Sequence, residues 1–131
     1  MTPEHMMRLA DAEREFEHTC AQGWVLRCRL PTRIEMRSAL RATEGNLDAA
    51  VERLVIGSVI GWANVKAVDI GVPEGMAGFD ASASLGFSAP LVQALLADRL
   101  DALDALQADF VARMNVRDDK LKADEKNSAS V

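Results

Sequence analysis

The chain has 131 residues, of which 49% are hydrophobic and 27% are charged, and its net charge is −5. This composition is that of a globular domain and excludes a wholly disordered or collagen-like chain. The longest apolar run, residues 54–63, is far shorter than the roughly 20 residues that cross a bilayer. The first residues lack the basic and apolar parts of a secretory signal. We therefore expect a cytoplasmic protein that is neither secreted nor bound to a membrane.

The N-terminal segment predicts a short helix followed by a β-hairpin. Thr2 can cap a helix over residues 2–14, and Pro3 suits its first position. Residues 24–30 alternate apolar and polar side chains, which predicts a half-buried strand. Residues 16–20 can return along it as the second strand of a hairpin.

Two helices are predicted next. Thr32 and Glu35 have the spacing of a capping box, so a helix is expected over residues 32–44, ending at Gly45. Asn46 can cap a second helix. Its apolar residues follow the helical period, and we expect it to run to about Gly61.

The following residues predict a long irregular loop and then two more helices. Glycines, a proline and small side chains dominate residues 62–86, and within them we expect a flexible loop over 66–86. Ser88 and Pro90 can open a helix. Asp98 or Asp101 is the expected cap of the last helix. Residues 117–131 are polar and are predicted to form a partly disordered tail.

These elements predict one domain over residues 1–131. The expected fold class is α+β and mainly α-helical, with four to five helices and one short strand or β-hairpin near the N-terminus. A lone strand would leave unpaired backbone edges. Such an edge calls for a hairpin or for pairing with a second copy, so a homo-oligomer is an open possibility.

The residues that bind metals or act as nucleophiles do not form a recognisable site. The soft ligands His5, His18, Cys20 and Cys28 lack the close spacing of structural zinc sites. We interpret Cys28 as a core residue. A Cys–His pair with His18 lacks an orienting third residue, and Asp101, Asp104 and Asp109 are interpreted as a solvated helix face. We expect no catalytic residue, no cofactor and no metal.

The arginines are the most informative charged residues. Residues 23–45 carry five arginines against two glutamates, between two acidic stretches. They can form a basic patch for an acidic partner, or they can pair with the acidic residues 11–17 of the same chain. The overall negative charge and the scarcity of aromatic residues make nucleic acid an unexpected ligand. The five candidate partner-binding arginines are Arg27, Arg29, Arg33, Arg37 and Arg41.

Three aromatic residues flank the glycine-rich segment or lie within it: Trp62, Phe79 and Phe87. Aromatic side chains on a mobile segment can anchor a partner protein. They can equally tie a loop to its own core, and the sequence alone leaves both interpretations open.

Several short segments occur in an order that resembles that of a known family of proteins. Arg29-Leu-Pro-Thr-Arg33 leads into a capped helix, and a second helix runs into Gly61-Trp-Ala-Asn-Val65. Gly86-Phe-Ser-Ala-Pro90 then opens a helix that contains Leu95-Leu-Ala-Asp-Arg99, and Glu125-Lys-Asn-Ser128 closes the charged end. Over residues 23–128 this layout resembles the small tail-assembly chaperones of long-tailed bacteriophages.

The resemblance implies a non-enzymatic function. Such chaperones are expected to bind the helical tape-measure protein, keep it soluble and help to recruit the major tail protein, in the host cytoplasm and without entering the mature virion. It also implies that a ribosomal frameshift at the codons of Glu125-Lys126-Asn127 can give a longer product. The competing interpretations are another phage morphogenesis protein, such as a head–tail joining factor, and a DNA-binding regulator that reads DNA with residues 32–44.

Overall fold

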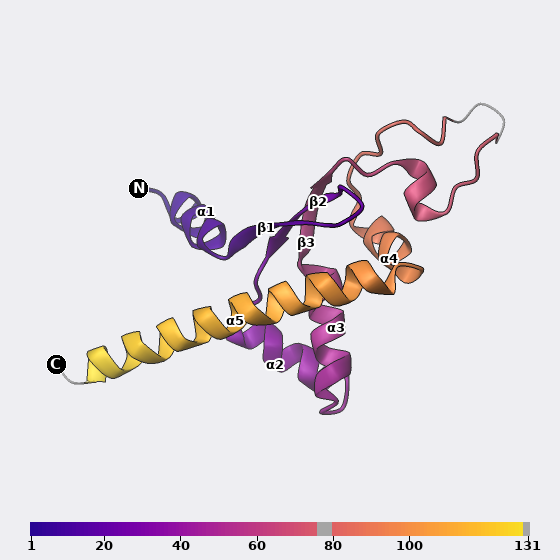
Figure 1. Cartoon of the computed structure of the whole chain (residues 1–131). Helices are drawn as coiled ribbons and strands as arrows, with labels where there is room; N and C mark the ends of the chain where they lie inside the picture. The colour runs from indigo at the N-terminus through magenta and orange to yellow at the C-terminus, as the bar shows by residue number, and fades with distance from the viewer. Residues whose placement is uncertain (76–79, 130–131) are drawn as a thin grey trace.

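The computed structural model describes residues 1–75 and 80–129 (Figure 1). Within these residues the chain forms five α-helices, one 3-10 helix and a three-stranded antiparallel sheet, and it is 60% helical. The expected α+β, mainly helical fold class is therefore confirmed. The elements in chain order are α1 (Pro3–Glu13), β1 (Glu15–Thr19), β2 (Val25–Arg29), α2 (Arg33–Ala42), α3 (Leu47–Ser58), β3 (Val59–Ala63), η1 (Ala67–Ile70), α4 (Ala89–Ala97) and α5 (Leu100–Ala129).

The N-terminal helix and hairpin form where the sequence predicts them. The Thr2 hydroxyl accepts a hydrogen bond from the His5 backbone N–H and so caps α1. β1 pairs with β2 in an antiparallel register that places Phe16 opposite Cys28. The alternating residues of β2 have the expected sidedness, because Leu26 is fully buried and Arg27 is exposed.

α2 begins with the predicted capping box between Thr32 and Glu35. The turn that follows contains Glu44 and Gly45, both with left-handed backbone angles (φ 55° and 81°). Asn46 then caps α3 through its side-chain oxygen, which accepts from the Ala49 N–H. The two helices form a hairpin below the sheet in Figure 1.

The predicted end of α3 is wrong, and with it the expectation that strands occur only near the N-terminus. α3 ends at Ser58 rather than near Gly61, and β3 begins at the next residue. β3 pairs antiparallel with β2, so the sheet order is β1-β2-β3 with β2 in the centre. Val59 and Ile60 are β-branched and suit a strand, but their apolar run also continues the pattern of the preceding helix.

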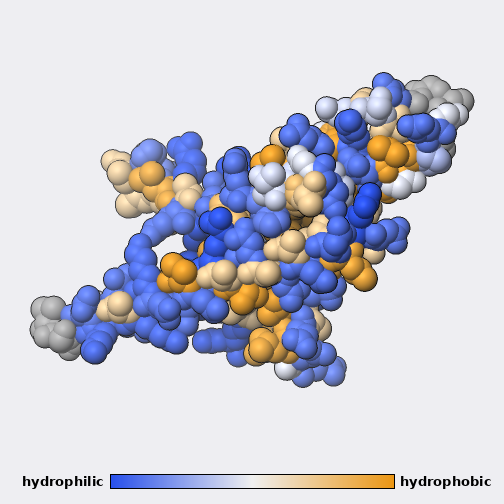
Figure 2. All heavy atoms as spheres, in the orientation of Figure 1, coloured by the Kyte–Doolittle hydropathy of each residue, from blue (hydrophilic) through white to orange (hydrophobic). Residues whose placement is uncertain are grey.

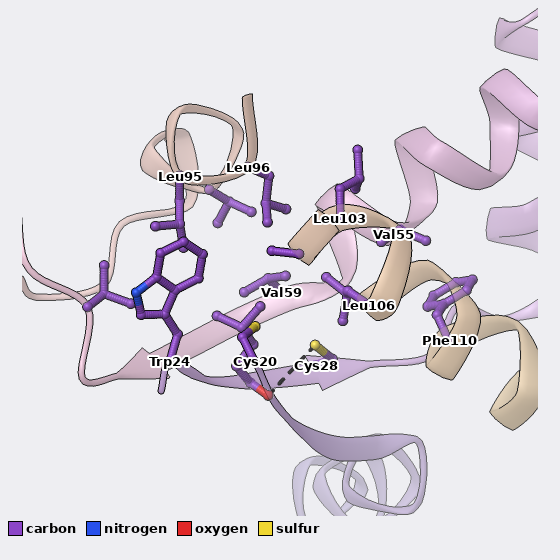
Figure 3. Packing of buried hydrophobic residues seen from close by; sticks show 14 of the residues in the cluster. Cys20, Trp24, Cys28, Val55, Val59, Leu95, Leu96, Leu103, Leu106 and Phe110 are labelled. Carbon is purple, nitrogen blue, oxygen red and sulfur yellow. Dashed lines mark hydrogen bonds between the residues drawn. The ribbon is translucent and has the colours of Figure 1, made fainter. Parts of the chain in front are cut away.

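One hydrophobic core joins the sheet to α3, α4 and the first half of α5 (Figure 3). Trp24 and Leu26 come from the hairpin, Val55 from α3, Leu95 from α4 and Leu106 from α5; each is at most 1% exposed. Burial of such large apolar side chains is the main favourable term in folding. The sheet is therefore held both by α3, which directly precedes β3, and by α4 and α5, which come later in the chain.

The segment predicted as a loop over 66–86 contains more structure than expected where it is described. It forms η1, and Lys66 makes an isolated bridge with Ser84. Leu85 donates a backbone hydrogen bond to Val65, which closes the base of the segment. Residues 76–79 lie outside the described residues.

The last helix differs from the prediction at both ends. Asp98 ends α4 instead of capping α5, which begins at Leu100. α5 runs to Ala129, through most of the range expected to be a partly disordered tail; residues 130–131 lie outside the description. An i,i+4 ion pair between Asp118 and Lys122 supports this exposed part of the helix.

Candidate protein-interaction surface

Helix α1 carries an apolar face that nothing in the described structure covers. None of its residues is buried, and it projects from the sheet as a separate helix (Figure 1). Met6 is 52% exposed, Met7 67% and Leu9 53%. Figure 2 shows apolar side chains gathered on this helix. A helix that presents a hydrophobic side to solvent marks a contact surface.

The last turn of α1 contacts α5. Glu13 Oε1 accepts a hydrogen bond of 3.0 Å from Lys120 Nζ of α5. Met6 and Leu9 are spaced from Glu13 by seven and four residues, so they lie along the same side of the helix as Glu13. Both stay exposed.

A groove of about 480 Å³ lies beside this contact, and α1 borders it through Glu13. Buried Phe16 and Leu30 lie at its base, and Val116, which is 71% exposed, lies on its α5 side. Figure 2 shows the hollow between α1 and the projecting end of α5. The other lining residues are Glu13, Arg14, Glu15, Asp109, Ala112, Arg113, Arg117 and Lys120.

The acidic residues of the groove are paired with cations of the same chain. A hydrogen bond from Lys120 lowers the pKa of Glu13, and a hydrogen bond from Arg29 lowers the pKa of Glu15. Arg14 donates to the Leu30 carbonyl oxygen at 2.6 Å and to Asp11 at 2.8 Å, which ties the end of α1 to the end of β2. The groove therefore has charged walls and an apolar base.

A polar network joins the base of the groove to α5. His18 Nδ1 lies 2.9 Å from Asp109 Oδ2, and Arg113 Nε donates to Asp109 Oδ1 at 2.8 Å. The Arg113 guanidinium lies 4.6 Å from the centre of the Phe16 ring, a cation–π contact. Burial alone would raise the pKa of Asp109, but the hydrogen bonds from His18 and Arg113 outweigh it and lower the pKa.

The interpretation of Asp109 as part of a solvated face is wrong, because the structure places it in this network. Asp101 is also engaged, since it accepts a hydrogen bond from the Gln22 side chain. His18 is 91 residues from Asp109. No local sequence pattern relates the two, so sequence reasoning could not find the pair.

The five candidate arginines separate into three groups. Arg27 and Arg29 both pair with Glu15, so these two follow the intramolecular alternative. Arg33 reaches across to Asp118 and Glu125 of α5. Arg37 and Arg41 are exposed and form no ion pair with any other described residue. The predicted basic patch is thus reduced to its α2 part.

Two of the three candidate aromatic residues contact each other. The rings of Trp62 and Phe87 meet edge to face, with centroids 5.1 Å apart. Trp62 Nε1 donates to the Leu85 carbonyl oxygen at 2.9 Å. The described contacts tie the end of the segment to β3. Phe79 lies outside the described residues.

The cysteines are placed in the core and not in a reactive site. Cys28 is fully buried, and burial raises the pKa of its thiol to about 12, so the nucleophilic thiolate is scarce at neutral pH. Burial also raises the pKa of Cys20. In Figure 3 both sulfur atoms lie among apolar side chains. Within the described ranges no three or more His, Cys, Asp or Glu residues are arranged to hold a metal ion.

In the part of the chain that the structure describes, no helix combines the length and the apolar character that crossing a bilayer requires. Comparison of the chain with protein-family models, with curated proteins and with solved structures found no match.

Proposed function

We propose that the protein is a tail-assembly chaperone of a long-tailed bacteriophage, which binds amphipathic helical segments of the tape-measure protein. The proposal combines the resemblance of residues 23–128 with one observation: α1 exposes the apolar side chains of Met6, Met7 and Leu9, and its last turn borders an open groove beside α5. The groove has α5 along one side and the buried side chains of Phe16 and Leu30 among its lining residues. A further helix is the shape that fits such a space.

The side chains suit a client whose sequence varies along its length. Methionine is flexible and polarisable, so it adapts to different apolar partners. Met6 and Met7 therefore supply contacts that do not demand a particular shape. The charged walls add contacts for the polar side of a bound helix. A tape-measure chain waiting for its tube exposes amphipathic helices, and covering them prevents aggregation.

The proposed activity makes and breaks no covalent bond. In this proposal the protein acts in the host cytoplasm, helps to recruit the major tail protein to the covered chain and stays out of the mature virion. A head–tail joining factor, in contrast, would be present in purified virions. Mass spectrometry of virions distinguishes these two functions.

The direct test is co-expression with fragments of the tape-measure protein. We expect the wild-type chain to raise the soluble yield of a fragment that aggregates alone. The double variant Met6→Ser with Leu9→Ser removes the apolar side of α1 and is expected to abolish this gain. Its effect on folding is small, because surface changes usually alter stability by less than about 0.5 kcal/mol.

The matched control places the same two serines on the opposite side of α1. Glu4 and Arg8 are exposed, are one turn apart and lie away from the Met6–Leu9 side. The variant Glu4→Ser with Arg8→Ser should keep the solubilising activity. Equal yields with wild type, with both variants and without the protein would refute the proposed function.

A further inference from the structure

A second cleft lies between α2 and α3 and adjoins the groove, because Arg29 and Pro31 line the cleft and Leu30 between them lines the groove. It has a volume of about 340 Å³ and an apolar base that includes Leu54 and buried Pro31. Ile34 stands at its edge and is 73% exposed. Figure 2 shows apolar side chains over the α2–α3 hairpin, at the lower edge of the molecule. The remaining lining residues are Arg29, Glu35, Ser38, Ala39, Arg53, Gly57 and Ser58.

Arginines without ion pairs lie in this cleft and along its Ile34 edge. Arg53 lines it and forms no ion pair with any other described residue. Arg37 and Arg41 do not line the cleft, but they lie three and seven residues after Ile34, so they share its side of α2, and they too lack ion pairs within the described chain. These three arginines contrast with Arg33, which pairs with α5.

The acidic residues nearby do not neutralise these arginines. Glu35 is the only acid that lines the cleft among the described residues, and its carboxylate already bonds to Thr32 and Arg14. Asp48 and Glu52 of α3, like Arg37 and Arg41, are not among the lining residues. The lining itself carries two arginines, Arg29 and Arg53, against the one acid Glu35, on a chain whose net charge is −5.

We propose that the α2–α3 cleft is a docking site for an acidic amphipathic helix of another protein. An apolar side chain of that helix enters the cleft beside Ile34. Carboxylates that flank it meet Arg53 on one side and Arg37 with Arg41 on the other. The charge complementarity selects the partner and speeds its association, while the buried apolar contact holds it. This site adjoins the groove through the contact between Arg14 and Glu35, but the proposal does not depend on the proposed function.

The observations favour a protein over nucleic acid as the occupant. A DNA or RNA backbone would be met by a surface of cations and hydrogen-bond donors. Here an exposed isoleucine and an apolar cleft lie between the cations. The acidic balance of the rest of the chain would repel a long polyanion.

The test uses a labelled synthetic helix with leucines on one face and glutamates elsewhere. Two further probes are a shuffled peptide of the same composition and a peptide with lysine in place of every glutamate. We expect the full chain to bind the first probe, more weakly as salt is raised, and to bind the other two at least tenfold more weakly. Backbone NMR shifts on binding should cluster at α2 and α3.

Three variants locate the site. Ile34→Asp, and Arg37→Glu together with Arg41→Glu, should each weaken binding at least about tenfold. The control is Arg99→Glu, because Arg99 is an exposed cation between α4 and α5 that forms no ion pair with another described residue. This control should bind the probe like the wild type.

Several results would overturn the proposal. Equal binding of the shuffled peptide would show that the surface attracts anions in general and does not recognise an amphipathic helix. Tighter binding of duplex DNA that is lost in the arginine variant would make it a nucleic-acid surface. Self-association of the wild type that is lost in Ile34→Asp, with no peptide binding, would identify a second copy as the occupant. Unchanged peptide binding in both variants would place the contact elsewhere.

Discussion

The two halves of helix α5 have opposite surroundings. In the first half, Leu103, Leu106 and Phe110 are at most 7% exposed and pack on the sheet. In the second half, Val116 is 71% exposed, and the helix itself projects beyond the rest of the molecule (Figure 1). Helix α1 resembles the second half, since none of its residues is buried. One continuous helix thus serves both as a structural element and as one wall of the proposed binding groove.

The contrast indicates which part of the molecule provides the stability of the fold and which part is available for binding. Burial of apolar side chains supplies the free energy of folding, so the packed half should govern unfolding. The projecting helices bury little and are free to contact another molecule. Four predictions test this division, beginning with the largest expected effect.

Leu106→Ala should lower the free energy of unfolding by about 2–5 kcal/mol, because it leaves a cavity in a packed core. The matched variant Leu9→Ala makes the same change on the 53% exposed face of α1. It should alter the free energy of unfolding by less than about 0.5 kcal/mol. Urea unfolding followed by circular dichroism measures both. A large loss in Leu9→Ala would show that α1 is part of the cooperative core.

Asp109→Asn should lower the free energy of unfolding by about 1–3 kcal/mol at pH 7, because it weakens charge-assisted hydrogen bonds to His18 and Arg113. The folded-state pKa of Asp109 lies below its ordinary value of about 3.9. Its stabilising contribution is therefore full above that value and is lost as the pH falls through the folded-state pKa.

The difference in unfolding free energy between wild type and Asp109→Asn should accordingly shrink below about pH 4. Arg99→Gln is a suitable control, since it changes one exposed charge outside the network. A difference that is constant between pH 7 and pH 3 would contradict the proposed origin of the effect.

Thr32→Ala should lower the free energy of unfolding by about 1 kcal/mol, since it removes the side-chain cap of α2. Thr32→Ser keeps the hydroxyl and should restore most of the loss. Chemical denaturation measures the three proteins side by side. If the serine variant is as unstable as the alanine variant, packing of the threonine methyl group, and not the cap, explains the effect.

Arg33→Ala should change global stability least, by less than about 1 kcal/mol, because its ion pairs with α5 are exposed. Its effect is expected locally, as faster amide hydrogen exchange in residues 117–129. Arg37→Ala, one turn away and without an ion pair among the described residues, is the control. Identical exchange in the two variants would show that Arg33 does not fasten the end of α5.

The sequence predicts most elements whose signals are local. The caps at Thr2, Thr32 and Asn46 act on residues within the next turn, and the alternation of residues 24–30 comes from a single strand. Each signal depends on neighbours in the chain, so it can be read without knowing the fold. The hairpin and the start of every helix before residue 60 follow from such signals.

The features that the sequence does not reveal are those decided by tertiary contacts. Val59 and Ile60 continue the apolar pattern of α3, and only pairing with β2 makes them a strand. Arg33 and Arg37 have the same spacing on one helix, yet only the first meets acidic residues of α5. The pair His18–Asp109 and the apolar groove likewise arise from segments far apart in sequence.

The position of Leu106 and Phe110 late in the chain has a consequence for synthesis on the ribosome. The sheet is complete by Ala63, but its apolar face is closed only when α4 and α5 arrive. A nascent chain therefore carries a sheet that α3 alone can cover while the next forty or so residues are made, on the order of seconds at typical translation rates. Slowing translation within that interval should lengthen the time during which newly made chains can aggregate.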